Sequence, residues 1–420
     1  MIIDSCRICG NSELIPILDL GHLALTSVFP SSPAEAVPAI PLELVRCSPS
    51  GCGLVQLRHT TDLRLMYNDR YGYRSGIRQF MIGHLRAAVA GILALADVAP
   101  GDLVVDIGSN DGTLLRAYPE RGLTLVGVDP VGNAFRDNYP ARADLIPDFF
   151  SRQAFTESYG RRRAKVVTSI AVLYDVPRPL EFMTDIRAIL AHDGIWLLEQ
   201  SYLPAMLANT AFDTVCHEHL AYYALAQIEW MAQRAGLTVI KAELNQVYGG
   251  SLRVLMTPRP SRYPADTGAV GLVRRAEAGL GLDQEGTYRR FARGALDRRD
   301  ELRAFLSRSA GSGLRTLGYG ASTKGNVLLQ FCGIGPDQLS CIGEPEAAKA
   351  GSYTPGTLIP IVPEEAARAL GPDQLLVLPW AYRDGFIERE REIMSRGTRL
   401  VFPLPTLTTV GAADLELRSA

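Results

Sequence analysis

LVVDIGSNDGTLLRAYPERGLTLVGVDP, residues 103–130, decides the fold, and it reads as a buried strand, a glycine-rich turn, a helix and a second strand. A strand buried on both faces of a parallel sheet is a continuous apolar run, which residues 103–105 and Ile107 provide. Gly108 and Gly112 follow where the strand ends. Because glycine has no Cβ, a ligand can lie against the backbone there, in the crevice at the carboxyl ends of the strands.

The turn predicts a cationic nucleoside rather than a diphosphate as its ligand. The dinucleotide fingerprint G-x-G-x-x-G is absent because position 110 is Asn, and Asp111 puts a carboxylate where a pyrophosphate needs only N–H groups. Asp106 and Asp111 are expected to place negative charge near the ligand, and Asp129 to accept both hydroxyls of a ribose. The pattern resembles motif I and the following acidic residue of class I S-adenosylmethionine-dependent methyltransferases, although a purely structural strand-turn-helix has the same appearance.

The size and charge of the chain limit the class of protein. With 420 residues of average hydrophobicity, the chain is expected to form two or three domains, each with its own core. The net charge of -2 and the single dense basic run at 161–165 predict no nucleic-acid partner. The start MIIDSCRICG does not read as a signal peptide, and no apolar run approaches the roughly 20 residues of a membrane span. We therefore expect a soluble cytoplasmic protein with no membrane partner.

Four of the seven cysteines lie in the first 52 residues and predict a zinc site. Cys6-x-x-Cys9 and Cys47-x-x-x-x-Cys52 form two close pairs, and four thiolates aimed at one ion make a closed tetrahedral site. A redox C-x-x-C would need a following helix, whereas residues 10–16 look like a hairpin. With no open ligand position, the zinc is expected to hold a small, core-poor domain together and to take no part in chemistry.

Segment 65–76, LMYNDRYGYRSG, follows the cysteines and is rich in tyrosine. Tyr67, Tyr71 and Tyr73 stand in a run too short and too mixed with polar residues for a core strand. A loop laid over a site is one interpretation, and packing between domains is the other.

Residues 76–257 alternate strands and helices, as a doubly wound parallel sheet does. We expect a helix at 78–97, a third strand ending at 148–150, further strands at 166–169 and 195–199, a helix at 179–190, and a final hairpin at 245–256. The loops at 170–176 and 200–202 would then lie at carboxyl ends of strands, beside the predicted ligand.

Segment 211–223, AFDTVCHEHLAYY, is the second informative stretch. His217, Glu218 and His219 can all move protons. A metal site, to which Cys216 could add a thiolate, is one alternative, but it needs both histidines on one face, which happens only if the segment is extended. A structural histidine pair at a helix cap is another alternative. We predict an acid–base cluster, because a neutral imidazole oriented by Glu218 can abstract a proton at neutral pH.

A proline-rich linker at 258–264 and long helices up to 309 lead to a last α/β unit. Its first turn, LRTLGYGASTK at 314–324, places helix N–H groups beside Lys324, which predicts an anionic ligand. Thr323 replaces the third glycine of the dinucleotide fingerprint, which weakens a nicotinamide interpretation. Glu344, after a strand expected at 339–342, is placed to meet a ribose hydroxyl. Later strands are expected to end at 380–382 and 403, and a purely structural domain is the alternative.

CHEHLAYY, GYGASTKGN, YGYRSG, GGSLR and the four N-terminal cysteines resemble, over essentially the whole chain, the sugar C-methyltransferases that methylate C-3 of nucleotide-linked 4-keto-deoxysugars. The resemblance implies S-adenosylmethionine as methyl donor, structural zinc, a dTDP- or GDP-linked sugar as substrate, and a monomer. It also implies a zinc module at 1–75, a class I (Rossmann-like) methyltransferase domain at 76–257 and a second Rossmann-like α/β domain at 258–420. This chain departs from the family at Tyr174-Asp175, where members often carry a histidine.

The resemblance also implies roles for individual residues. His219 is expected to be the base, Glu218 and His217 to orient it or hold the enolate oxygen, and Tyr71 to donate a hydrogen bond to that oxygen. The residues expected at the methyl donor are Tyr73, Gln79, Asp106, Gly108, Asn110, Gly112, Asp129, Pro130, Asp148 and Ser169. Those expected at the sugar nucleotide are Tyr174, Ser201, Tyr202, Tyr222, Arg253, Tyr319, Ser322, Lys324, Asn326, Glu344 and Tyr382.

Two other functions are compatible with these motifs. One is a zinc-containing methyltransferase that acts on oxygen or nitrogen of RNA or a small metabolite, although RNA binding would demand a basic surface. The other is a nucleotide-sugar oxidoreductase or binding protein whose last domain holds a nicotinamide.

Overall fold

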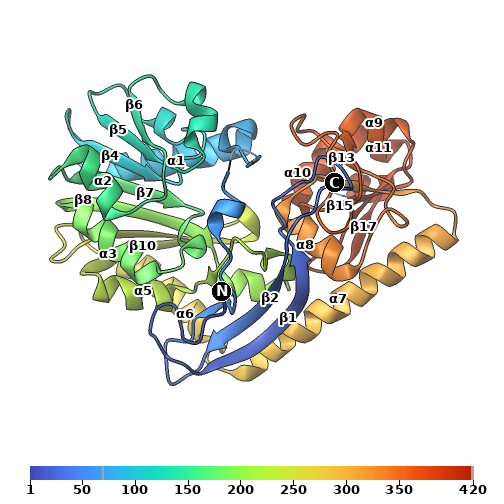
Figure 1. Cartoon of the computed structure of the whole chain (residues 1–420), viewed down its shortest axis with the longest axis horizontal. Helices are drawn as coiled ribbons and strands as arrows, with labels where there is room; N and C mark the ends of the chain where they lie inside the picture. Colours follow the sequence, from blue (N-terminus) through green and yellow to red (C-terminus); the bar gives the residue numbers. More distant parts are fainter. Residues whose placement is uncertain (69–70, 418–420) are drawn as a thin grey trace.

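The computed structural model describes residues 1–68 and 71–417. Two positions of the tyrosine-rich segment at 65–76, residues 69 and 70, lie outside the described residues. The described residues form sheets of four, seven and six strands. In Figure 1 the seven-stranded sheet and its helices lie on the left, the six-stranded sheet on the right, and the N-terminal strands below and between them. Among the described helices, none is long and apolar enough to cross a membrane.

The seven-stranded central sheet has the order β10-β11-β8-β7-β4-β5-β6. Its strands are β4 (Leu103–Ile107), β5 (Thr124–Val128), β6 (Ala143–Ile146), β7 (Ala164–Ile170), β8 (Leu190–Ser201), β10 (Leu237–Asn245) and β11 (Ser251–Pro258). Its helices are α1 (Gln79–Leu95), α2 (Arg152–Tyr159), α3 (Pro179–Ile189), α5 (Leu225–Arg234) and α6 (Thr267–Ala278). Strands β4 to β8 pair in parallel, whereas β11 is antiparallel to β8 and β10. The predicted doubly wound α/β sheet, with a closing hairpin, is confirmed.

The helix predicted directly after β4 is wrong. Residues 108–118 form turns and one short 3-10 helix, η3 (Leu115–Ala117). A helix could begin only after Gly112, which has φ +70°, and it would have to end before Pro119. Too few residues remain between them for an α-helix. The third strand likewise stops at Ile146, because Pro147 follows.

The six-stranded sheet has the order β14-β13-β12-β15-β16-β17, with only β17 antiparallel. Its strands are β12 (Thr316–Tyr319), β13 (Ile342–Glu344), β14 (Ile361–Pro363), β15 (Gln374–Val377), β16 (Arg399–Phe402) and β17 (Thr408–Val410). Its helices are α8 (Thr323–Cys332), α9 (Glu364–Ala369), α10 (Arg383–Arg389), α11 (Arg391–Ser395) and α12 (Ala412–Leu417). The strand expected at 339–342 begins later because a turn closes from Gly335 to Leu339, and 380–382 is a 3-10 turn, η8 (Trp380–Tyr382). The second Rossmann-like unit is confirmed.

The four-stranded sheet contains a strand that local sequence patterns did not predict. Beside β1 (Leu14–Ala24), β2 (Ala39–Cys47) and β3 (Val55–Leu57) lies β9 (Ala221–Tyr222), which comes from the CHEHLAYY segment. Val55 and Gln56 pair with it antiparallel, and Leu57 N donates to Leu220 O at 2.9 Å. The N-terminal strands therefore position the histidine-rich segment.

The N-terminal sheet packs on both α/β units. Leu44 belongs to the hydrophobic cluster that reaches Leu317 of the six-stranded sheet, and Leu54 belongs to the cluster of the central sheet that contains Trp196. The long helix α7 (Glu285–Gly311) contacts β1, α8 and the short helix α4 (Leu203–Ala208), and it runs along the lower right of Figure 1. Strand β9 pairs with the N-terminal strands across the predicted domain boundary at 75/76, and α6 packs on β10 across the one at 257/258. The two domain boundaries therefore stay predictions.

The four N-terminal cysteines converge on one point. Their Sγ atoms all lie within 4.8 Å of one another, with 3.5 Å from Cys6 to Cys52 and from Cys9 to Cys47. Sulfurs on a tetrahedral zinc with bonds of about 2.3 Å would lie roughly 3.8 Å apart, so the thiols fit the ion and fill its shell. Residue 51 has to be glycine, because a Cβ there would lie 2.4 Å from the Cys47 sulfur. This is a closed, structural zinc site.

We predict that Cys47→Ser removes the zinc and unfolds the N-terminal module together. Loss of one thiolate opens the coordination shell, and metal binding in such modules is coupled to folding. Metal analysis should fall from about one zinc per chain to almost none, with a lower melting temperature. Cys341→Ser, a buried cysteine outside the cluster, is the control that keeps its zinc. A chelated protein that remained folded but inactive would show that the zinc is not structural.

Candidate functional site

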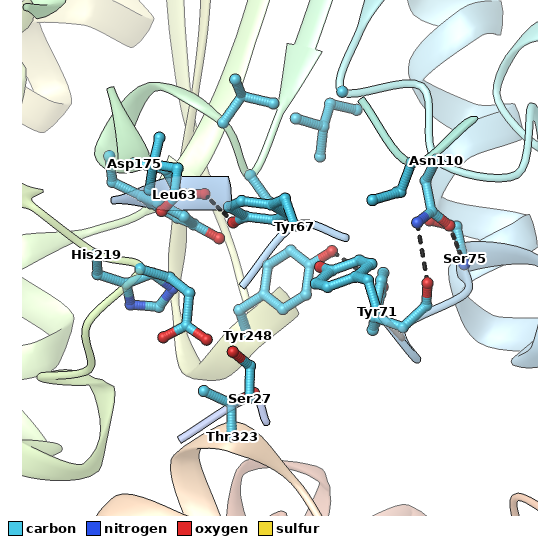
Figure 2. Close-up of a pocket in the computed structure, with 18 of the residues that line it drawn as sticks. Ser27, Leu63, Tyr67, Tyr71, Ser75, Asn110, Asp175, His219, Tyr248 and Thr323 are labelled. Atoms are coloured by element: carbon cyan, nitrogen blue, oxygen red, sulfur yellow. Dashed lines mark hydrogen bonds between the residues drawn. The ribbon is translucent and has the colours of Figure 1, made fainter. Parts of the chain in front are cut away.

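A cavity of about 850 Å³ is lined by strand ends of the central sheet and by loops next to the other two sheets. Loops after β4, β5 and β7 line one end, and the start of α8 with the η8 turn lines the other. The tyrosine-rich segment and the CHEHLAYY segment lie between these ends. Figure 2 shows His219 and Asp175 on one side, Asn110 on the other, and Tyr67, Tyr71 and Tyr248 in the middle.

At the first end, a carboxylate and a glycine turn form a cradle for a nucleoside. Asp129 accepts the backbone N–H of Asn110 through Oδ2 and of Val131 through Oδ1, both at 2.8 Å, and a carboxylate oxygen keeps a further lone pair for a ligand. Gly108 has φ +70°, and a Cβ there would lie 2.4 Å from Val172 Cγ2. An acidic acceptor beside this open turn fits the ribose of S-adenosylmethionine.

The charges at this end differ from those expected. Burial raises the pKa of Asp106 to about 7, although the Thr168 hydroxyl donates to its carboxylate at 2.5 Å. Asp111 does not line the cavity, so its contribution of negative charge near the ligand stays a prediction. Its carboxylate instead accepts the Gly76 N–H at 3.0 Å and the Thr113 hydroxyl at 2.6 Å, which ties the tyrosine-rich segment to the turn.

His219 lies on the cavity wall in one tautomer. Its Nδ1 lies 2.9 Å from the carbonyl oxygen of Thr214, which can only accept, so Nδ1 carries the proton and Nε2 keeps a lone pair. Burial and, next, the positive charge of Lys324 lower the pKa of His219 to about 3. The imidazole is therefore neutral at physiological pH and has a free basic nitrogen.

The other two members of the cluster act differently. Glu218 also lines the cavity, and the Thr26 hydroxyl donates to its Oε2 at 3.5 Å. His219 is instead oriented by its hydrogen bond to the Thr214 carbonyl. His217 is fully buried outside the cavity, and its Nε2 donates to Ile40 O at 3.1 Å. Among the described residues, the four cysteines are the only group of three or more potential ligands close enough to hold a metal, which leaves this segment without a metal site.

The opposite end of the cavity carries positive charge. Ser322 caps α8 by accepting the Gly325 N–H at 3.1 Å, and Lys324 donates to Tyr248 O at 3.1 Å. Lys349 and Arg78 line the same cavity. Lys349 pairs with Glu346 at 2.9 Å, which leaves Lys324 as the cation at the start of α8 itself. A helix start with an adjacent lysine fits an anionic group such as a diphosphate.

The cavity brings together more than half of the residues predicted for the site. Those that line it are Tyr71, Tyr73, Asp106, Gly108, Asn110, Asp129, Pro130, Tyr174, Ser201, Glu218, His219, Ser322, Lys324 and Tyr382. Those placed elsewhere are Gln79, Gly112, Asp148, Ser169, Tyr202, His217, Tyr222, Arg253, Tyr319, Asn326 and Glu344.

Several residues outside the cavity hold its wall in place. Glu344 accepts the Ala321 N–H at 2.6 Å, and Asn326 donates to Thr26 O at 2.7 Å. Ser169 accepts from Trp196 Nε1 at 2.9 Å within the core, while Arg253 donates to Glu199 at 2.5 Å. Their contacts are with protein groups.

The wall also contains residues that sequence reasoning did not assign to the site. They include Tyr67, Asp175, Asp213, Tyr248, Lys349 and Trp380. Tyr248 is held at φ +58°, a conformation rare for a residue with a side chain, and its position before Gly249-Gly250 in the hairpin turn was the available signal. Trp380 Nε1 donates to Asp213 at 2.7 Å, a contact between distant segments that no local pattern indicates.

Comparison with known proteins agrees with this geometry. Three family models match in order, described as "Putative zinc binding domain" at residues 6–67, "Methyltransferase domain" at 78–242 and "C-methyltransferase C-terminal domain" at 246–405. C-methyltransferase NovU of Streptomyces niveus is 30% identical over 413 residues, which are 98% of this chain and 97% of NovU.

Solved structures match more distantly. The CcbJ methyltransferase of Streptomyces caelestis is 16% identical, with 41% of this chain and 89% of that chain covered and a TM-score of 0.33. LepI in complex with S-adenosylmethionine is 17% identical, with 44% and 54% covered and a TM-score of 0.34. Scores this low add nothing to the family models and the full-length relative, from which it follows that the chain belongs to the S-adenosylmethionine-dependent C-methyltransferases.

Proposed function

We propose that the protein methylates C-3 of a nucleotide-linked 4-keto-deoxysugar, with a dTDP or GDP carrier, and that His219 is the general base. The observation that supports this most is a neutral imidazole with a free Nε2 on the wall of the cavity that also contains the nucleoside cradle and the cationic helix start. The nucleoside cradle would hold the methyl donor, and the helix start the sugar diphosphate. We also propose that it works as a monomer on a small-molecule substrate.

The chemistry requires a base that removes a proton from the carbon beside the ketone. A carbon beside a ketone loses its proton because the anion delocalises onto the carbonyl oxygen, and the resulting enolate carbon is the nucleophile. S-adenosylmethionine supplies the methyl group when bound. His219 Nε2 takes the proton, and the imidazolium that forms is balanced by the enolate, so the pair stays neutral although an isolated imidazolium is unfavourable there.

A ketone at C-4 acidifies both C-3 and C-5, so the carbon that reacts has to be measured. We would incubate the protein with S-adenosylmethionine and either dTDP-4-keto-6-deoxyglucose or GDP-4-keto-6-deoxymannose. Mass spectrometry should detect the gain of one methyl group with retention of the ketone, and NMR should place it on C-3. A methyl group on oxygen or nitrogen, or on C-5, would refute this assignment.

We predict that Asp129→Ala weakens S-adenosylmethionine binding about 10- to 100-fold, because the ribose loses charge-assisted hydrogen bonds of about 1.5–3 kcal/mol. Calorimetry should show little change for the sugar nucleotide. The 2′-deoxy analogue of S-adenosylhomocysteine supplies the matched test, since it should bind wild type and variant more alike than the parent ligand does. Equal weakening of both substrates would mean that the loss of the Asn110 and Val131 contacts had damaged the turn.

We also predict that Lys324→Ala raises the dissociation constant of the sugar nucleotide roughly tenfold or more, because the diphosphate loses a charge-assisted donor at the start of α8. Affinity for the methyl donor should stay within about twofold, since Lys324 lies at the other end of the cavity. Calorimetry with each ligand separately measures both values. Loss of methyl-donor affinity alone would reverse the assignment of the two ends.

Our third prediction here is that His219→Asn abolishes both methyl transfer and exchange of the C-3 proton with deuterium from solvent. Loss of a general base lowers the rate roughly 10²–10⁴-fold while ligand binding remains. NMR in deuterium oxide, with S-adenosylhomocysteine in the donor site, isolates the exchange step. His192→Asn, which changes an exposed histidine, is the control. Wild-type exchange in His219→Asn would move the base to another residue.

A further inference from the structure

Asp175 is a carboxyl group on the cavity wall that the reaction above leaves without a role. It ends the short helix η5 (Leu173–Asp175), which follows β7. Its neighbour Tyr174 packs on the base, with 4.2 Å between the Tyr174 and His219 ring centroids. Asp175 and His219 line the same cavity, and Figure 2 shows them on the same side of it. A ketone held at His219 would therefore lie on the same side of the cavity as this carboxyl group.

The two oxygens of Asp175 have different surroundings. The hydroxyl of Tyr67 donates to Oδ2 at 2.7 Å. Oδ1 is buried and has no hydrogen-bond partner among the residues that the structure describes. An ionised carboxylate in this position would leave a charged oxygen without a donor, which is unfavourable in a protein interior. A carboxylic acid that accepts from Tyr67 through Oδ2 and carries its proton on Oδ1 needs only an acceptor, which a ketone oxygen provides.

No positive charge compensates this carboxyl group within the described part of the chain. The titratable groups that interact with it are neutral or acidic: Tyr67, Tyr71, Tyr174, Cys216, Glu218, Tyr222 and Tyr223. Burial first, and then the like charge of Glu218, raise the pKa of Asp175 well above its usual range, against the lowering by the Tyr67 hydrogen bond. The surroundings therefore favour the protonated acid over the carboxylate.

We propose that Asp175 is a catalytic residue whose protonated Oδ1 donates a hydrogen bond to the ketone oxygen of the substrate and stabilises the enolate. This role rests on the proposed function. The C-3 proton goes to His219 Nε2, the electron pair of the C–H bond goes to the ketone oxygen, and Asp175 keeps its own proton. When the enolate carbon takes the methyl group, the carbonyl re-forms and the hydrogen bond weakens again. Neutral carboxylic acids in apolar sites stabilise enolates of other enzymes in this way.

The test compares D175N with D175A. The amide of D175N can still accept from Tyr67 and donate to the ketone, so deuterium exchange at C-3 of dTDP-4-keto-6-deoxyglucose should slow by less than about tenfold. D175A has no donor and should slow exchange and methyl transfer roughly 10²–10³-fold. D144N is the matched control, because Asp144 accepts from the Tyr159 hydroxyl at the same 2.7 Å on the surface, and it should match wild type.

The pH dependence gives a second readout. The donor is present below the pKa of Asp175 and is lost as the pH rises through it, so wild-type exchange should fall at alkaline pH. D175N does not titrate and should keep its rate over the same range. Carbon-13 NMR of protein labelled at the aspartate carboxyl carbons, with D175N to assign the signal, should find Asp175 protonated at pH 7 without any substrate.

Each failure has a distinct signature. If D175N exchanges as slowly as D175A, or if the carbon-13 signal shows an ionised Asp175 at pH 7, the carboxyl group acts in its charged form and the proposal is overturned while the proposed function stands. If wild-type protein neither exchanges C-3 nor methylates either sugar nucleotide, the proposed function fails and the role of Asp175 fails with it.

Discussion

The pairing of β3 with the two-residue strand β9 is the constraint on which the site depends. Residues 213–220 contain little regular structure, so on their own they would not hold His219 in one orientation. The Leu57–Leu220 hydrogen bond and the Ile40 contact of His217 attach this segment to the N-terminal sheet. That sheet is in turn held at its end by the four cysteines. A metal remote from the chemistry thus supports the geometry of the reacting groups.

Burial, rather than paired charge, sets the protonation states of the cavity. A histidine on a protein surface would be partly charged near neutral pH, whereas His219 is kept neutral because burial disfavours its charged form and Lys324 lies nearby. Burial likewise raises the pKa values of Asp106 and Asp175. Enclosure therefore favours the neutral forms of this imidazole and of these two carboxyl groups, while lysine and arginine side chains line the same cavity.

Much of the fold could be predicted because its signals are local. Buried parallel strands such as 103–107 are continuous apolar runs, the hairpin has two glycines in its turn, and the cysteine spacing suits a metal. The helix after β4 was predicted wrongly because the general pattern of such sheets was given more weight than Gly112 and Pro119. Strand β9 was missed because a strand of two residues exists only through its partner, far away in the sequence.

The part of the candidate site that follows from the topology of the sheets could also be predicted. Residues at strand ends and helix starts, such as Asp129 and Lys324, line the cavity as expected, since the topology alone brings them there. Arg253, Asn326 and Glu344 were chosen for their chemistry, yet their partners are protein groups in distant segments. The strained Tyr248 and the Asp213–Trp380 contact depend on how the two α/β units meet, and no single stretch of sequence contains that information.

The hydrophobic cluster shared by the N-terminal sheet and the six-stranded sheet has a consequence for engineering. Exchange of the C-terminal unit between relatives, as a way to change the nucleotide that is accepted, looks simple from the linear order of the family models. In space, Leu44 of β2 and Leu317 of β12 belong to one continuous interior. A graft cut in the proline-rich linker would keep α7 with the C-terminal unit but would sever that interior from β1 and β2, so a transplantable unit has to carry these two strands as well.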